Sequence, residues 1–205
     1  MRRTGRTRAG LPRPLPRRFF ARHTVVVARA LLGCLLVHVT PRGMLVGRIV
    51  ETEAYRGPRD PASHAYRRTP RSAIMYGLPG VAYVYLSHGV HRCLNVVTED
   101  DGRPGAVLLR AVEPLRGLPL MRRRAPGVPA ARIASGPGRL ARALGITLRH
   151  NGADLTRPPL YLAAGRRPGR VVAGPRVGVG AAIGRRWRFG VAGHPSLSRP
   201  FRPVL

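Results

Sequence analysis

Polar and apolar residues alternate through the stretch 45–55, LVGRIVETEAY, as is typical of a β-strand with two different faces. A two-residue side-chain period places Ile49, Glu51, Glu53 and Tyr55 on one of these faces. We therefore expect two carboxylates and a phenol to share one surface.

A second alternating stretch, VAYVYL at 81–86, brings Tyr83 and Tyr85 to a common face. The short polar break Ser87-His88-Gly89-Val90 separates it from another apolar run at 93–97. This pattern predicts a β-hairpin with His88 at its tip.

Other apolar runs predict the framework around these two stretches. A short helix is expected to begin with Thr24 as its cap and to end at Gly33, followed by a strand at 35–40 in which His38 is a packed residue. The run AVLLRAVEPL at 106–115 predicts a strand that carries Arg110 among apolar neighbours. A charge in that setting needs a partner.

The segment ASGPGRLARALGI at 134–146 predicts a helix opened by Ser135 or Gly136, with Leu140 inward and Arg139 outward. A helix N-terminus beside an arginine suits a phosphate group, so Ser135, Gly136 and Arg139 are candidate contacts to a phosphate backbone.

The remaining segments predict loops and short strands. We expect a long loop at 57–80, a solvated acidic turn that includes Glu99, and a surface excursion at 116–134. Two short strands are expected after residue 171, with Trp187 as a core aromatic.

The chain carries an unusually large positive charge. Its 205 residues include 37 basic residues, all of them arginine, against eight acids, which gives a net charge of +29. Residues 1–18 hold seven of these arginines and no acid, and we predict that they form a disordered basic arm ahead of one folded domain, 19–205. Part of the excess fits the arginine-rich composition of a GC-biased coding sequence. The remainder indicates a nucleic-acid partner.

Several functional classes are disfavoured by what the sequence lacks. Cys34 and Cys93 lie in apolar runs and are expected to be core residues, and His88 and His91 have no third ligand at a metal-binding spacing, so no metal site is predicted. Neither a Gly-x-Ser-x-Gly motif nor a phosphate-binding glycine loop occurs. No apolar stretch of membrane-spanning length and no signal peptide is present, so we expect a cytoplasmic protein without a membrane contact, associated with the nucleoid if bacterial.

The carboxylates on the aromatic strand face allow two interpretations. Glu51 and Glu53 could simply pair with arginines in a non-catalytic, arginine-rich nucleic-acid-binding protein. Alternatively, one of them could act as a general base beside an aromatic pocket that receives a flipped base. The residue pattern by itself does not choose between the two.

A resemblance to a known family is carried by four segments: RIVETEAYRGP, VAYVYLSHGVHRCLN, AVLLRAVEPL and SGPGRLARALGI. They closely resemble the alkyladenine-type 3-methyladenine DNA glycosylases, a monofunctional family that removes alkylated purines, and the similarity runs from about Leu15 to Gly193. The resemblance implies a single α+β domain, a curved antiparallel sheet with surrounding helices and a protruding β-hairpin at 81–97. It further implies a monomeric hydrolase of base excision repair that needs no cofactor and acts on double-stranded DNA containing damaged purines.

Site roles follow from the same resemblance. The water-activating glutamate of the family falls on Glu53, and the arginine that helps to hold the water falls on Arg110. The base pocket falls on Tyr55, His64, Tyr85 and Asn95. The residue that intercalates into the duplex falls on His88, where the family usually has tyrosine. A second departure is Gly190, where an aromatic residue is more common.

Overall fold

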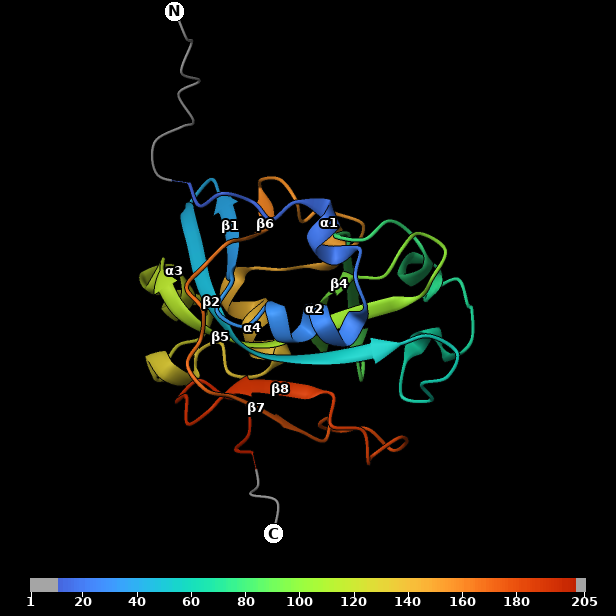
Figure 1. Cartoon of the computed structure of the whole chain (residues 1–205). Coiled ribbons are helices and arrows are strands. Elements are labelled where there is room, and N and C mark those ends of the chain that lie inside the picture. The colour runs from blue at the N-terminus through green and yellow to red at the C-terminus, as the bar shows by residue number, and fades with distance from the viewer. Residues whose placement is uncertain (1–10, 202–205) are drawn as a thin grey trace, which may run out of the picture.

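The computed structural model describes residues 11–201, which fold into one curled antiparallel sheet with short helices around it (Figure 1). The strands are β1 (Leu35–Thr40), β2 (Gly43–Arg56), β3 (Ala82–Ser87), β4 (His91–Val97), β5 (Gly105–Arg116), β6 (Leu160–Ala163), β7 (Val171–Gly174) and β8 (Arg188–Val191). The α-helices are α1 (Arg17–Phe20), α2 (Thr24–Ala30), α3 (Leu118–Arg124) and α4 (Pro137–Leu144). Single 3-10 turns lie at His64–Tyr66, Ala73–Tyr76, Ala130–Arg132 and Leu148–His150. The predicted α+β class and curved antiparallel sheet are confirmed.

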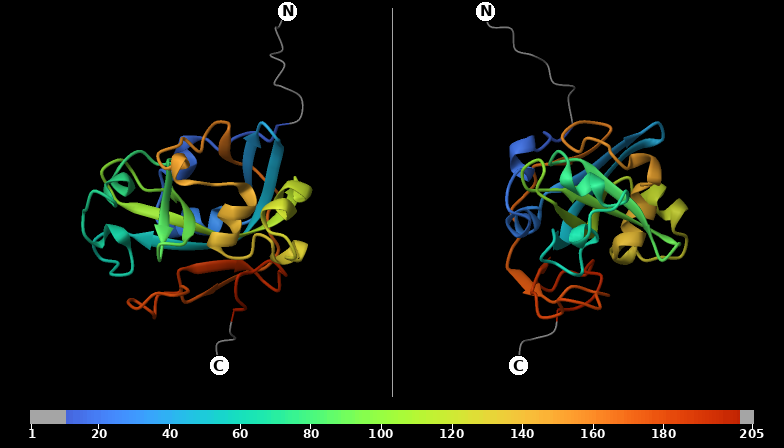
Figure 2. Two further views of the ribbon diagram at one scale, coloured as in Figure 1. Left: turned by 180° about the vertical axis from the view of Figure 1, so that it is seen from behind. Right: turned by 90° about the vertical axis from the view of Figure 1, so that its right-hand side faces the viewer.

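The sheet runs in the order β3-β4-β5-β2-β1-β6, and β2 is its organising strand. The first half of β2 pairs with β1, whereas residues 51–53 pair with β8, which in turn pairs with β7. One long strand thus changes partners along its length, and this change divides and curls the sheet. Figure 2 shows β7 and β8 beneath the rest of the sheet, at the end from which the chain leaves.

Register shifts in the β2–β5 ladder correct one prediction about the strand faces. The ladder is irregular between Ile49 and Glu51 and again between Glu51 and Thr52. Ile49 packs in the main core with Ala54, and Thr52 donates its hydroxyl hydrogen to the Ala28 carbonyl of α2 at 2.8 Å. Since an extra residue reverses the alternation, Ile49 does not share a face with Glu51, as the simple two-residue period predicted.

The start of α2 is capped differently from the prediction. His23 precedes the helix as its N-cap without a side-chain hydrogen bond, and Thr24 is its first helical residue. The Glu99 carboxylate accepts hydrogen bonds from the Thr24 amide at 2.7 Å and from the Thr24 hydroxyl at 2.6 Å. Glu99, predicted to be solvated, instead supplies the negative charge that a helix N-terminus favours.

The predicted arm, residues 1–18, falls only partly within the described residues, since residues 1–10 lie outside them. The Leu15 amide donates to the Leu162 carbonyl at 2.8 Å and its side chain is buried. Arg17 in α1 forms an ion pair with Asp154 at 2.9 Å, and Arg157 lies 3.3 Å from the same carboxylate oxygen. Residues 11–18 therefore belong to the folded body.

The segment 116–134 is also more ordered than the predicted surface excursion. It contains α3, whose Leu120 and Met121 are buried, and it ends with Ile133 and Ala134 in the core. Its arginines Arg122 and Arg123 are exposed. The pattern was hidden because three consecutive arginines follow the two buried residues.

Candidate active site

A buried cluster of opposite charges lies on the paired strands β2 and β5. Glu51 and Glu53 are fully buried, and Arg110 of β5 is 6% exposed. The Arg110 Nε donates to Glu51 Oε1 at 2.9 Å, and its Nη1 donates to Glu53 Oε2 at 3.2 Å. The expected partner of Arg110 is thus found, and the two glutamates share a face because both reach the same guanidinium.

Every other contact of Glu51 is also to a donor. Its Oε1 accepts from Arg188 Nε at 2.8 Å and from the Ser198 hydroxyl at 2.7 Å, and its Oε2 accepts from the Ser198 amide at 2.6 Å. Burial alone would raise the pKa of Glu51, but Arg110, Arg188 and Ser198 together lower it below its ordinary value. Glu51 is an ionised, hydrogen-bonded anchor for two arginines.

Glu53 has fewer donors and faces a different neighbour. Its Oε1 accepts from the Val177 amide at 2.7 Å, and its Oε2 accepts from the Tyr55 hydroxyl at 2.7 Å as well as from Arg110. Burial and the nearby Glu53 charge raise the pKa of the Tyr55 phenol strongly, so Tyr55 stays protonated and its hydroxyl donates a hydrogen bond to Glu53. Tyr55 also lines a cavity, so this hydrogen bond links the buried carboxylate to the cavity wall.

This cavity has a volume of about 540 Å³. Its walls come from four separate parts of the chain: the end of β2 with the turn after it, the segment of the two 3-10 turns that follow, the β3–β4 hairpin, and the loop between β7 and β8. The lining residues that matter below are Tyr55, His64, Arg71, Tyr83, Tyr85, Leu86, His88, Asn95, Gly178 and Ala181. The four predicted pocket residues are therefore brought together.

The aromatic wall is built from side chains that hold one another. The rings of His64 and Tyr85 are edge to face with centroids 4.6 Å apart, and Tyr83 lies 5.2 Å from Tyr85. The His64 Nδ1 is 2.7 Å from the Tyr83 hydroxyl. Burial and Arg71 lower the pKa of His64, which favours a neutral imidazole in this wall.

Two further residues complete the cavity. Asn95 is buried, and its Nδ2 donates to the Tyr83 carbonyl at 3.0 Å, which fixes the orientation of the amide. Arg71 was not predicted: its guanidinium carbon lies 4.9 Å from the centroid of the Tyr85 ring. In the sequence it is one of many arginines in an irregular loop, and no periodicity distinguishes it.

A buried ion pair that was not predicted supports two of the loops around the cavity. Arg176 and Asp60 are both fully buried in their side chains and form a bidentate ion pair with distances of 2.7 and 2.8 Å. The same guanidinium lies 4.7 Å from the centroid of Tyr55 and 5.3 Å from that of Trp187. Trp187, predicted to be a core aromatic, is half-buried at the edge of the main core and also contacts Arg176 and Arg185. The pair joins the turn after β2 to the loop after β7.

The hairpin forms as predicted, with β3 and β4 in register from Ala82 opposite Val96 to Ser87 opposite His91. His88 is exposed at the tip and has a φ of +48°. Few residues other than glycine adopt this conformation, although histidine tolerates it better than most.

The three candidate phosphate contacts differ in how far they are exposed to solvent. Gly136 is the N-cap of α4, and Arg139 is exposed in the first turn of the helix. Ser135 is buried, and its hydroxyl donates to the Leu197 carbonyl at 2.9 Å. Its side chain is thus committed inside the protein. The helix itself adjoins the hairpin, since a Cβ atom at Gly138 would come within 3.0 Å of the His91 ring.

Gly190, which replaces the more common aromatic residue, has a steric explanation. A Cβ atom at this position would lie 2.5 Å from the ring of Phe201 and 3.0 Å from Leu197. The C-terminal segment fills the space that an aromatic side chain would occupy.

Within residues 11–201, no three His, Cys, Asp or Glu side chains gather in a way that could hold a metal ion. The helices in that part of the chain are too short and too polar to span a bilayer.

A buried carboxylate and arginine beside an aromatic cavity define an enzyme-like site for a flat ligand. The sequence model of the family described as "Methylpurine-DNA glycosylase (MPG)" matches residues 18–195. Relatives named "Putative 3-methyladenine DNA glycosylase" include one from Bacillus licheniformis, 47% identical over 91% of this chain and 97% of its own length. Another, from Anaeromyxobacter dehalogenans, is 50% identical over 91% of this chain and 86% of its own length. The chain belongs to the methylpurine-DNA glycosylase family.

Proposed function

We propose that this protein is a monofunctional DNA glycosylase, which extrudes a damaged purine from duplex DNA and hydrolyses its N-glycosidic bond with a water activated by Glu53. The observation that carries this proposal is the placement of Glu53. It is a fully buried carboxylate that accepts hydrogen bonds from Arg110 and from Tyr55, and Tyr55 lines the aromatic cavity.

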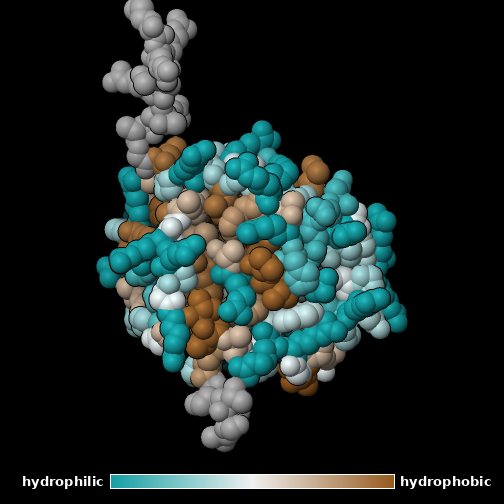
Figure 3. All heavy atoms as spheres, viewed as in Figure 1, coloured by the Kyte–Doolittle hydropathy of each residue, from teal (hydrophilic) through white to brown (hydrophobic). Residues whose placement is uncertain are grey.

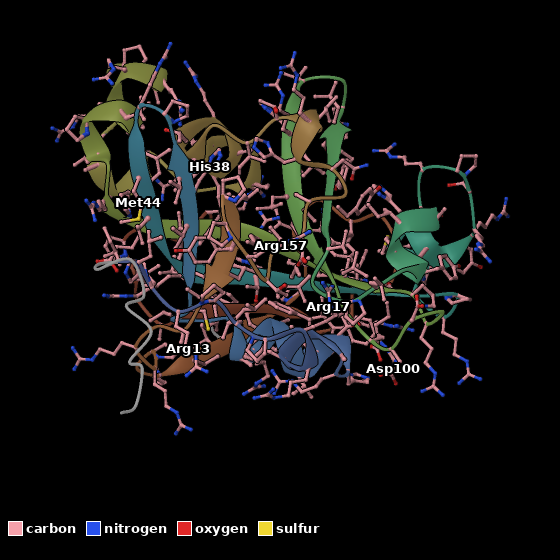
Figure 4. All side chains as sticks on the ribbon, turned by 90° about the horizontal axis from the view of Figure 1, so that it is seen from above. Arg13, Arg17, His38, Met44, Asp100 and Arg157 are labelled. Carbon is pink, nitrogen blue, oxygen red and sulfur yellow. The ribbon has the colours of Figure 1, made fainter. Side chains whose placement is uncertain are left out.

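Arginine supplies the affinity for DNA. Figures 3 and 4 show hydrophilic side chains over most of the visible surface, with many nitrogen-tipped side chains directed outward. Exposed arginines flank the cavity on the segments that line it, namely Arg59, Arg71, Arg92 and Arg186. They would neutralise phosphates without reading sequence, so binding should weaken as salt rises.

The cavity accounts for lesion recognition. N-alkylation leaves a purine electron-poor and often cationic, and the π-faces of Tyr55 and Tyr85 attract such a ring more strongly than a neutral base. A neutral His64 adds stacking area without charge repulsion. Asn95, with its amide fixed by Tyr83, would help to select among purines by hydrogen bonding at the pocket floor.

In the chemical step, a water beside Glu53 attacks the anomeric carbon of the extruded nucleotide. The bond from that carbon to the base nitrogen breaks, and its electron pair leaves with the base. The water oxygen forms the new bond, and Glu53 takes the water proton. A cationic base needs little protonation to leave. Arg110 orients the carboxylate and the water.

The competing function is a non-catalytic, arginine-rich nucleic-acid-binding protein. The saturated ion pairs of Glu51 fit that function equally well, because they need no chemistry. Glu53 fits it less well, since a purely structural glutamate gains nothing from a hydrogen bond to a tyrosine that lines the cavity.

Release of free base separates the two functions. The protein is incubated with a duplex that carries one alkylated purine, and free base, abasic sites and strand breaks are each measured, with the undamaged duplex as the control. We expect base release without nicking, because the sequence has no lysine to form a Schiff base with the abasic sugar. Binding without base release would contradict the proposal, and efficient borohydride trapping of a covalent adduct would contradict its monofunctional part.

A further inference from the structure

The loop between β7 and β8 forms part of the rim of the cavity. Residues 178–181 of this loop line the cavity together with residues 86–88 of the hairpin. Figure 1 shows the loop running outward from the two C-terminal strands beneath the segment that follows β2. The mouth therefore has two protruding rims, one from the hairpin and one from this loop.

The two most exposed large apolar side chains lie at these two rims. Val90 is 69% exposed and Ile183 is 62% exposed, the two highest values among the large hydrophobic residues that the structure describes. Each lies two positions beyond a cavity-lining residue, His88 in one case and Ala181 in the other. Exposed apolar groups beside a binding site commonly mark a contact surface.

Each of the two rims also contains a residue with an unusual backbone conformation. In the described part of the chain, three residues other than glycine have a positive φ: His88 at +48°, Ala182 at +51° and Glu99. The first two are at the tips of the two rims. For alanine such a conformation is unfavourable, and strain of this kind is often found at functional loops.

Contacts at both ends of the loop between β7 and β8 hold its tip in place. Arg176 is fixed by Asp60 at one end of the loop. At the other end, Arg185 donates to the Arg59 carbonyl at 2.6 Å and lies 4.5 Å from the centroid of the Trp187 ring. The loop thus holds Ile183 outward, next to the cationic side chains of Arg185 and Arg186.

We propose that Ile183 is a second DNA-contacting wedge, which packs against the base step beside the extruded nucleotide while His88 acts from the hairpin. This inference rests on the proposed function. The flanking arginines and the shared cavity mouth select duplex DNA as the occupant, and apolar side chains are used to unstack base steps in other DNA-binding proteins. A second wedge would compensate for the smaller stacking area that His88 offers compared with tyrosine.

The test compares Ile183→Ser with Val26→Ser, a matched change at an exposed residue of α2 that does not line the cavity. Single-turnover excision is measured on one lesion in duplex and in single-stranded DNA at one salt concentration. We expect Ile183→Ser to slow duplex excision on the order of tenfold and single-strand excision less than about twofold. Val26→Ser should change neither rate.

A second readout does not depend on catalysis. 2-Aminopurine beside the lesion brightens when it is unstacked, and Ile183→Ser should reduce this increase on binding. Wild-type rates and fluorescence for Ile183→Ser would overturn the proposal, as would an equal loss on both substrates, which would indicate a damaged pocket. Failure of the wild-type protein to release base from either substrate would instead contradict the proposed function.

Discussion

Glu51 and Glu53 lie two residues apart on β2 and share Arg110, yet their environments differ. Glu51 receives four hydrogen bonds, from two arginines and from the amide and hydroxyl of Ser198. Glu53 receives one of its three from Tyr55 at the cavity wall. The two-residue period could place both acids on one face but could not distinguish them, because their partners Val177, Arg188 and Ser198 come from distant parts of the chain.

The environment of Glu51 predicts a pH-dependent stability. Because its folded pKa lies below the ordinary value, its contribution is complete above the unfolded pKa and is lost as pH falls through the folded pKa. Glu51→Gln should lower the free energy of unfolding by about 2–4 kcal/mol near pH 7. The difference from wild type should shrink below about pH 4.

Denaturant unfolding across pH measures this difference. Glu113→Gln is the control, since Glu113 pairs with Arg48 at a third-exposed site and should contribute under about 1 kcal/mol. A Glu51→Gln variant as stable as wild type at pH 7 would show that this anchor is unimportant.

His88 predicts a graded effect of side-chain size at the hairpin tip. His88→Ala removes the group that fills the gap left by an extruded nucleotide, so excision from duplex DNA should fall while binding to undamaged DNA changes little. His88→Tyr should keep or raise excision, because tyrosine offers a larger stacking surface. Normal excision by His88→Ala against every opposing base would reduce His88 to a turn residue.

Among the structural elements, the two loops joined by the Asp60–Arg176 ion pair are the main feature that the alternation of polar and apolar residues does not predict. Asp60 and Arg176 lie 116 positions apart, and neither sits in a periodic segment. The hairpin, α4 and the strands other than β6, which was not predicted, could be predicted because their patterns are local. The β2 irregularity that turns Ile49 away, the capping of α2 by Glu99 and the Asp60–Arg176 pair depend on tertiary contacts, which one sequence does not encode locally.

Breaking this brace should affect the cavity more than the surface. Asp60→Asn leaves Arg176 as a buried charge without a counterion, so stability should fall by about 3 kcal/mol. The ratio of affinities for lesion and undamaged duplexes should also fall, because both cavity-forming loops lose their common anchor. Fluorescence anisotropy at one salt concentration measures this ratio, with the exposed Asp100→Asn as the charge-matched control. An unchanged ratio for Asp60→Asn would show that the Asp60–Arg176 ion pair does not contribute to lesion recognition.

At the scale of the whole molecule, charge and fold have different origins in the sequence. The net charge of +29 could be read from composition, and it predicts DNA affinity that falls linearly with the logarithm of salt concentration. The curled sheet positions a few neutralised acids inside this basic body, where Arg110 and Arg188 offset Glu51 and Glu53. The acids therefore repel the DNA phosphates less than unpaired carboxylates would, and chemistry and binding can coexist.

The proposed mechanism depends most on the activation of the water by Glu53. The most direct measurement is single-turnover excision together with lesion-duplex affinity, for wild type, Glu53→Gln and Glu51→Gln at one salt concentration. We predict that Glu53→Gln slows excision by at least about a thousandfold while it binds the lesion duplex as tightly as wild type or more tightly, since a negative charge near the DNA is lost. Glu51→Gln should lose stability more than chemistry. Near-normal excision by a folded Glu53→Gln variant would contradict the account.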